Sequence, residues 1–335
     1  MRRWLRPLLG ALVTLVFVWL FAQRVEWQRV GAALAAARPI PLFAAGLFLV
    51  ADFFLRIVRW WWMVRAMRPD VTLGRCAGPF LAGIALNNLL PLRAGDVART
   101  VAFRNQLGTR GMALLGTLVI ERLLDLMVLL GLFFVGLVGA GQGALPPLFV
   151  NAAAWAAVSG AIAVALLVLA PGAMRALADA LLRRLGATRR SLVAKLVDAL
   201  QPLFEALALL RSAHLMARLV AVSLLAWICE GAVFACAGAA LGIAGWGPWF
   251  ALATGTLATL IPSSPGYVGT FDYFAMLGLS AYGVGSASAG AMVLIVHALL
   301  WAPLTVAGLV CLARPADGSL RPDGAPTVDK PARQT

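Results

Sequence analysis

Long apolar runs dominate this sequence and limit what it can fold into. They occupy residues 5–22, 42–63, 112–140, 146–170, 215–241 and 288–312. A helix needs about 20 apolar residues to cross a bilayer, and tilt accommodates longer runs. The chain is 62% hydrophobic and 13% charged, which excludes an ordinary soluble domain. Because no strand-like alternation recurs, we expect an all-α polytopic membrane protein with six full transmembrane helices.

The distribution of Lys and Arg predicts which parts of the chain face the cytoplasm. Basic residues precede the first run, follow the second and are densest in residues 171–214. By the positive-inside rule, these regions and both termini are cytoplasmic. Leucines at steps of three and four indicate an interfacial helix or helical hairpin within that basic segment. The predicted domains are a transmembrane domain over residues 1–314, which includes the basic segment, and a disordered cytoplasmic tail over residues 315–335.

The formal net charge of +14 has a simple explanation in this setting. Positive-inside topology and attraction to anionic lipid headgroups account for an excess of this size. Nucleic acid is not an expected partner, because the sequence shows no soluble domain that would hold it. We therefore expect the membrane itself and an anionic headgroup as partners.

Two shorter apolar stretches break off at proline and polar residues. They cover residues 79–91 and 250–261, and each is too short to cross a bilayer. For the basic segments to stay cytoplasmic, residues 79–111 and 247–285 must each begin and end on one side. We therefore expect two re-entrant helical hairpins from opposite faces, an arrangement typical of an inverted-repeat transporter. A thin true span over residues 79–90 would instead expose the basic segment outside.

Charged residues gather beside the first break and in two neighbouring runs. An ionised group near the bilayer centre costs roughly 2.5–3.5 kcal/mol, so each one needs a partner or a wet cavity. Asp52, Arg56 and Arg59 share one helix face, and the sequence leaves open whether they serve structure or function. Beside the break, guanidinium groups and free amides favour binding of a phosphate. The candidate residues here are Asn87, Asn88, Pro91, Arg93, Asp96, Arg99, Glu121, Arg122 and Asp125.

The second break supplies backbone groups rather than charge. Its prolines end a helix and remove donors, and its glycines permit unusual dihedral angles and close approach. Ser263 or Ser264 is placed to cap a helix that begins near Gly266 and to direct its positive end toward the membrane interior. A purely structural kink is the alternative. The candidate residues are Pro262, Ser263, Pro265, Gly266, Gly269 and Asp272.

No catalytic or metal-binding pattern accompanies these residues. The sequence contains no G-x-S-x-G, H-E-x-x-H or P-loop motif, and neither histidine stands near a nucleophile or a ligand cluster. The four cysteines form no C-x-x-C pair. Glu121 and Asp125 are spaced like an acid–base pair, but the neighbouring arginines favour structural pairing. We therefore expect no enzymatic activity, no metal and no cofactor.

Three motifs stand in a fixed order along the chain. They cover residues 87–99, residues 121–125, and residues 262–269 followed by Asp272. Together they resemble the lysylphosphatidylglycerol synthase transmembrane-region family, also called flippase-like membrane proteins. The resemblance implies a bacterial inner-membrane protein related to the lipid-translocating half of multiple peptide resistance factors. Asp96 and Asp272 stand where glutamate is more usual. The full-length synthases carry an aminoacyl-transferase domain that this sequence lacks, so we expect no lysyl transfer by this chain alone.

From the residues and the resemblance together, we expect translocation of an anionic phospholipid or lipid-linked intermediate across the cytoplasmic membrane. Arg93, Arg99 and Arg122 would hold the phosphate, and the carboxylates beside them would orient them or change protonation. With no nucleotide motif, facilitated or ion-coupled movement is expected. The alternative is a non-catalytic membrane partner of a glycosyltransferase or lipid-modifying enzyme. Intramembrane modification of lipid ranks below both.

Overall fold

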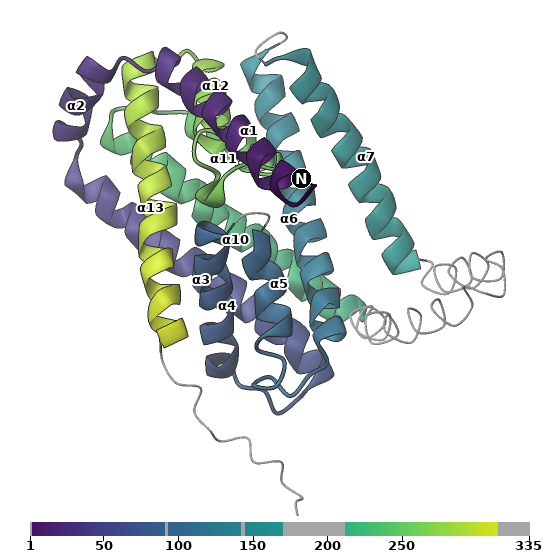
Figure 1. The fold of residues 1–335 in the computed structure, drawn as a ribbon. Coiled ribbons are helices and arrows are strands. Elements are labelled where there is room, and N and C mark those ends of the chain that lie inside the picture. The colour runs from purple at the N-terminus through teal and green to yellow at the C-terminus, as the bar shows by residue number, and fades with distance from the viewer. Residues whose placement is uncertain (1, 91–92, 142–144, 170–211, 314–335) are drawn as a thin grey trace, which may run out of the picture.

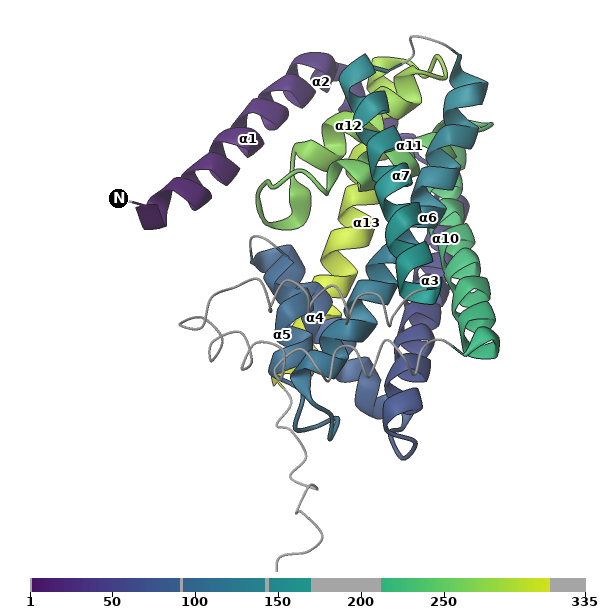
Figure 2. The same cartoon turned by 90° about the vertical axis from the view of Figure 1, so that its right-hand side faces the viewer.

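The structure is a computed structural model that describes residues 2–90, 93–141, 145–169 and 212–313. All regular secondary structure within these ranges is helical, as predicted. Four helices are long and apolar enough to cross a membrane, with mean hydropathy of 1.9 to 2.4. They are α3 (Pro39–Met67), α6 (Gly111–Ala140), α10 (Ala213–Ala240) and α13 (Ser286–Ala313), and they run roughly along the vertical direction of Figure 2.

Helices also form at the other two predicted spans. α1 (Arg2–Arg24) runs obliquely and packs against the second hairpin, whereas α7 (Pro147–Leu169) packs beside α6 (Figure 1). A short helix that was not predicted, α2 (Trp27–Ala35), connects α1 to α3. Residues 171–211 and 315–335, for which we predicted an interfacial helix and a tail, lie outside the described residues.

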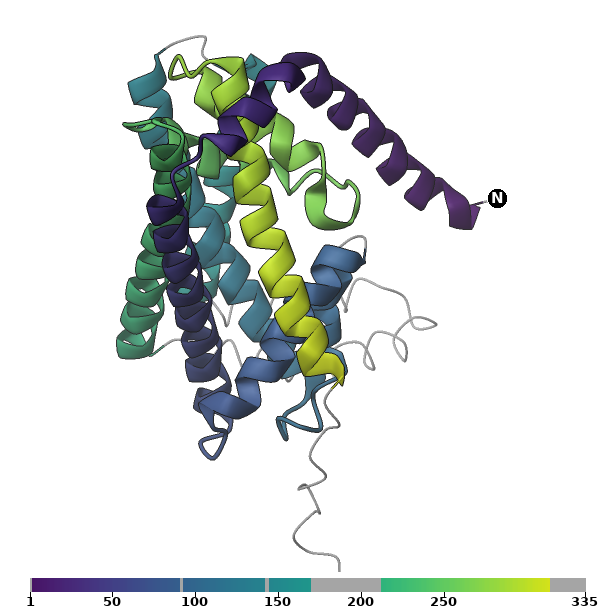
Figure 3. The ribbon, with the colours of Figure 1, turned by 90° about the vertical axis from the view of Figure 1, so that its left-hand side faces the viewer.

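Two helical hairpins occupy opposite halves of the molecule, and their tips face each other (Figure 3). The first consists of α4 (Leu73–Leu89) and α5 (Ala94–Val101). The second consists of α11 (Gly247–Ala258), the 3-10 turn η2 (Pro265–Tyr267) and α12 (Thr270–Ser280). The breaks predicted from sequence therefore lie at the hairpin tips. α4 begins before the predicted apolar stretch, with Pro79 inside the helix.

Glycines allow the first hairpin to pack with almost no separation between backbones. A Cβ atom on Gly95 of α5 would lie 2.0 Å from the carbonyl oxygen of Gly83 on α4. A Cβ atom on Gly308 of α13 would lie 2.2 Å from the carbonyl oxygen of Leu81 on α4. Both distances are far inside van der Waals contact. Small residues at helix contacts are typical of membrane proteins, and here they fix α5 on α4 and α4 on α13.

Apolar clusters hold each hairpin against the long helices. Around the second hairpin, the rings of Phe133 and Phe250 lie 5.7 Å apart, and Phe274 stacks on Phe149 at 4.5 Å. A separate cluster packs α4 against α3 and the start of α6. The polar residues described below lie between these two apolar regions.

Gly95→Ala tests the α4–α5 contact. The new methyl group has no room beside the Gly83 carbonyl, and overpacking of this kind costs about 1–3 kcal/mol. We expect a lower melting temperature for the detergent-purified protein, measured by circular dichroism. Gly78→Ala on α4 is the matched control, because nothing lies within 4 Å of that position and Ala favours a helix. Equal melting temperatures for the two variants would contradict the contact.

Candidate functional site

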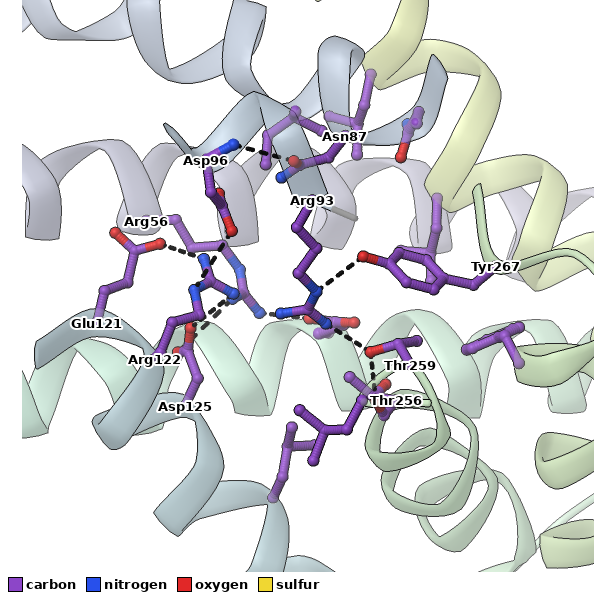
Figure 4. Close-up of a pocket in the computed structure, with 18 of the residues that line it drawn as sticks. Arg56, Asn87, Arg93, Asp96, Glu121, Arg122, Asp125, Thr256, Thr259 and Tyr267 are labelled. Atoms are coloured by element: carbon purple, nitrogen blue, oxygen red, sulfur yellow. Dashed lines mark hydrogen bonds and ion pairs between the residues drawn. The ribbon is translucent and has the colours of Figure 1, made fainter. Parts of the chain in front are cut away.

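A cavity of about 570 Å³ lies between the two hairpin tips and helices α3, α6, α10 and α13. This volume is within the range of small-molecule sites, about 300–1,000 Å³. Apolar side chains form much of the wall, and charged groups project among them (Figure 4). The acidic and basic residues in the lining, histidine included, are Arg56, Arg93, Asp96, Glu121, Arg122, Asp125, Glu230 and His297.

One face of α3 carries the three charged residues that the sequence predicted to align. Arg56 Nε donates to Asp52 Oδ1 at 2.7 Å, and Arg56 Nη2 pairs with Glu230 on α10. One turn further along α3, Arg59 donates from Nη1 and Nη2 to the two carboxylate oxygens of Asp125, at 2.6 and 3.2 Å. These ion pairs tie α3 to α6 and α10, and they neutralise both arginines.

A second group of ion pairs joins α5 to α6. Arg99 Nη2 donates to Glu121 Oε1 at 2.8 Å, and Arg122 Nη2 donates to the same oxygen at 2.5 Å. The Asp96 carboxylate lies 3.7 Å from Arg99 and 3.8 Å from Arg122. Arg99 has a side chain only 1% exposed, held between two aromatic rings, and it lies outside the cavity lining. It therefore positions Glu121 and Asp96 rather than reaching the cavity.

Arg122 is the most exposed member of this group. Its side chain is 38% exposed, whereas that of Glu121 is 1% exposed. Arg122 also lines the cavity (Figure 4). Its guanidinium is thus anchored on buried carboxylates and presents its remaining surface to the cavity.

Arg93 is distinguished by neutral partners. Its Nε donates to Tyr267 Oη at 2.7 Å and its Nη2 donates to Thr259 Oγ1 at 2.6 Å (Figure 4). The guanidinium carbon also lies 5.4 Å from the centre of the Tyr267 ring. Within the described ranges, Arg93 forms no ion pair with a carboxylate, in contrast to Arg56 and Arg122. Its positive charge is therefore available to an anion in the cavity.

Arg93 and Tyr267 also share an unusual backbone conformation. Of the non-glycine residues that the structure describes, these two have positive φ, 52° and 58°. For a residue with a side chain, the left-handed backbone conformation costs roughly 1–2 kcal/mol. Arg93 is therefore the N-cap residue and lies outside the helical turns of α5 that hold Asp96 and Arg99. The two positive φ values also place one strained residue on each hairpin tip, in contact with the other.

Two asparagines fix the first tip. Asn87 Oδ1 accepts from the backbone N–H of Asp96 at 3.0 Å, which caps the start of α5. Asn88 Nδ2 donates to Thr305 Oγ1 on α13 at 2.9 Å, and Trp301 Nε1 donates to the Asn88 carbonyl oxygen at 3.4 Å. The asparagines thus hold the backbone on either side of the break. Pro91, the third candidate in this motif, lies outside the described residues.

The second tip is organised by Asp272 rather than by serine. The prediction that Ser263 or Ser264 caps the following helix is wrong, because neither hydroxyl has a hydrogen-bond partner among the described residues. α12 instead begins after Gly269, where φ is 82°, and its Asp272 Oδ2 accepts from the Gly269 N–H at 2.7 Å. The positive φ turns this N–H back toward the first turn of α12, within reach of a carboxylate three residues on.

The remaining residues of the second break shape the tip. Gly266 is buried, lines the cavity and has φ of 68°. A Cβ atom there would lie 2.8 Å from Trp301 Nε1, so the glycine permits both the turn and the close approach to α13. Pro262 and Pro265 flank the turn and are exposed.

A pair formed by half-buried His297 and buried Asp272 completes the site. His297 on α13 lines the cavity, and its Nδ1 lies 2.6 Å from Asp272 Oδ1. Nothing in the sequence connects His297 with Asp272, since the two residues are 25 positions apart. The contact pairs His297 with a single carboxylate of the described residues, so it is not a ligand cluster.

Three other contributors were missed by sequence reasoning. Glu230 is a lone acid in a long apolar run, and that isolation is a signal which could have identified it. Thr259 and Tyr267 are neutral residues whose contacts with Arg93 join positions 166 and 174 apart. Nothing in the local sequence indicates such contacts. Within the described ranges, no group of three or more His, Cys, Asp or Glu side chains comes together to hold a metal.

Comparison with known proteins places the chain in a family. The model of the lysylphosphatidylglycerol synthase transmembrane region matches residues 8–308, which is most of the chain. The protein therefore belongs to this family, and it is a multi-pass membrane protein with a lipid-related function. The same comparison gave no match among curated proteins and none among solved structures.

Asp125→Asn tests whether the ion pairs hold the helices together. The change leaves Arg59 buried without its partner, and breaking a buried pair from one side costs about 3–5 kcal/mol. We expect a clear fall in melting temperature. Asp70→Asn is the matched control, because the Asp70–Arg68 pair is exposed and screened by water. That hydrogen bond lowers the pKa of Asp70, yet the same chemical change there should leave the melting temperature unaltered. An equal fall in melting temperature for both variants would contradict the claim that the Arg59–Asp125 pair holds the helices together.

Proposed function

We propose that this protein moves an anionic phospholipid or lipid-linked intermediate across the cytoplasmic membrane. The surroundings of Arg93 carry the proposal. A guanidinium whose described hydrogen-bond partners are neutral faces a cavity where two helical hairpins meet. An anionic headgroup supplies the negative charge that those partners lack.

The headgroup phosphate would bind between Arg93 and Arg122. Planar guanidinium groups bind phosphate through paired N–H donors, and both side chains line the cavity. Phosphate oxygens can replace the hydroxyls of Tyr267 and Thr259 on Arg93 without breaking an ion pair. The other arginines of the cluster are held by carboxylates and, unlike Arg122, have side chains no more than 10% exposed, so they stabilise the protein and do not compete for the lipid.

The rim of the cavity suits the rest of a lipid. Val97, Leu260 and Trp301 line the cavity and are 51%, 57% and 37% exposed. Large apolar side chains in these positions match acyl chains that remain in the bilayer. The polar headgroup would then cross through the cavity while its tails move along the rim. This division keeps the charge away from hydrocarbon, where it costs several kcal/mol.

The proposal includes an orientation in the membrane. Six helices cross, and the two hairpins are re-entrant from opposite faces, with both termini cytoplasmic as positive-inside counting predicts. Short helices are tolerated at membrane depth when protein or a wet cavity surrounds them. The hairpins meet this condition because α4 packs on α13 and α11 packs on α6. An inverted repeat would give the cavity access from each side in turn. In this proposal the protein is a transporter and not an enzyme.

Reconstituted vesicles test the function. The protein would be placed in phosphatidylcholine vesicles with a trace of acyl-labelled fluorescent phosphatidylglycerol, and an impermeant reductant would report the label in the outer leaflet. We expect wild-type protein to expose inner-leaflet label and Arg93→Gln to slow this by about tenfold or more, because one charged contact to phosphate is worth roughly 1.5–3 kcal/mol.

Arg29→Gln is the matched control. Arg29 pairs with Glu26 on the surface, and its side chain is 77% exposed, so removing its charge should leave lipid movement unchanged. A label on zwitterionic phosphatidylcholine should move more slowly than the anionic one. If wild-type protein moves neither label, the transporter proposal is wrong, and a non-catalytic role beside a glycosyltransferase or lipid-modifying enzyme is favoured.

A further inference from the structure

The pair formed by His297 and Asp272 is a feature of the cavity that phosphate binding does not use. Its members come from different helices, α13 and α12, and Nδ1 and Oδ1 are 2.6 Å apart. Asp272 is 4% exposed, and the His297 side chain is 17% exposed. Phe271 packs edge-on against the imidazole, with ring centroids 5.5 Å apart. The pair is thus enclosed on the Asp272 side and open to the cavity on the His297 side.

Asp272 connects this pair to the second hairpin tip. Its Oδ1 contacts His297, and its Oδ2 accepts from the Gly269 N–H at 2.7 Å. Gly269 is two residues from Tyr267, whose hydroxyl accepts from Arg93. A change in the force on the Asp272 carboxylate therefore reaches the phosphate-binding arginine through a few covalent and hydrogen bonds.

Few described side-chain hydrogen bonds hold the loop of residues 262–269, which precedes α12. The hydroxyls of Ser263 and Ser264 in the loop, and that of Thr270 at the start of α12, are buried and have no hydrogen-bond partner in the described part of the chain. Buried polar groups normally find partners. Besides the bond from Arg93 to Tyr267, the described side-chain bonds that hold this loop are those from Asp272 and from Thr14, whose Oγ1 accepts from the Ser264 N–H at 2.7 Å. Asp272 is therefore one of the few groups that fix the position of the tip.

Apart from Asp272, the charged groups near His297 pair with each other. Of the described helices packed against α13, α12 contributes Asp272, while Glu230 on α10 and Arg56 on α3 face the same cavity and pair with each other. α4 contributes the neutral Asn87 and Asn88 there, and α2 contributes no lining residue. Asp272 is therefore the carboxylate in ion-pair contact with the imidazole.

We propose that the His297–Asp272 pair is a proton-binding site, and that lipid movement by this protein is coupled to a proton. The inference rests on the proposed function. Imidazole is the side chain whose charge ordinarily changes between pH 5 and 8. With Nδ1–H donating to Asp272, Nε2 takes a proton from water in the cavity and later returns it. The protonated ring forms a full ion pair with Asp272, which pulls on the Gly269 N–H and the second tip.

The experiment uses the same vesicles with an imposed pH gradient, and potassium with valinomycin clamps the membrane potential. A transporter coupled to one proton shifts the leaflet ratio of labelled phosphatidylglycerol by up to about tenfold for each pH unit. A transporter with no coupling leaves the ratio unchanged. We expect a shift of several-fold for wild-type protein and none after a proton–potassium exchanger collapses the gradient.

His297→Asn removes the titrating ring while its amide can still donate to Asp272. We expect this variant to lose the response of the leaflet ratio to the gradient. His214→Asn is the matched control: His214 is the other of the two histidines of the chain and lies exposed at the start of α10, so its response should equal that of wild type. His297→Gln replaces the Asn variant if size-exclusion chromatography shows that the latter does not fold.

The possible outcomes distinguish proton coupling from the proposed lipid movement on which it rests. If wild-type protein equilibrates the label but ignores the gradient, proton coupling is wrong and lipid movement stands. If His297→Asn and His297→Gln respond as wild type does, the proton binds elsewhere and the assignment is wrong. If wild-type protein moves no label at all, both proposals fall together.

Discussion

A charge inside a membrane protein must have a counter-charge within reach, and the rest of this structure depends on that requirement. Arg59 with Asp125 and Arg56 with Glu230 connect α3 to α6 and α10 in the middle of long apolar helices. Removing one partner is far more costly than the pair is stabilising, so these helices can pack in few other registers. That register in turn presents Arg122 to the cavity.

The two hairpins solve a related problem for the backbone. A helix that stops short of a full crossing leaves carbonyl and N–H groups unpaired, and hydrocarbon offers them nothing. Here the Asn87 side chain and the Asp272 carboxylate satisfy N–H groups at the starts of α5 and α12. Close packing at Gly95 and Gly308 then encloses the first hairpin in protein. The breaks are therefore stable features, and they leave polar groups facing the cavity.

Sequence reasoning located the long helices and the two breaks because apolar run length and proline position are local signals. It also identified the aligned face of Asp52, Arg56 and Arg59, since helix periodicity alone decides it. Periodicity could not place the Arg93 side chain, because it assumes helical dihedral angles and this residue has positive φ. Sequence reasoning missed Tyr267 because hydroxyl partners carry no charge that would mark them. The contacts that define the site are long-range, and only the fold brings them together.

The two hairpin tips differ in a way that suits a carrier. The first tip supplies a cation, Arg93, and the second supplies neutral hydroxyls from Tyr267 and Thr259. In the proposed function, a phosphate bound to Arg93 would compete with these hydroxyls, so substrate binding would weaken the contact between the tips. The positive φ values at Arg93 and Tyr267 work in the same direction, because separation allows both residues to relax. Since the Asp272 carboxylate accepts a hydrogen bond from the second tip at Gly269, the proposed substrate at Arg93 and the proposed proton at His297 would act on one element. Coupling between two ligands requires such a shared element with two arrangements.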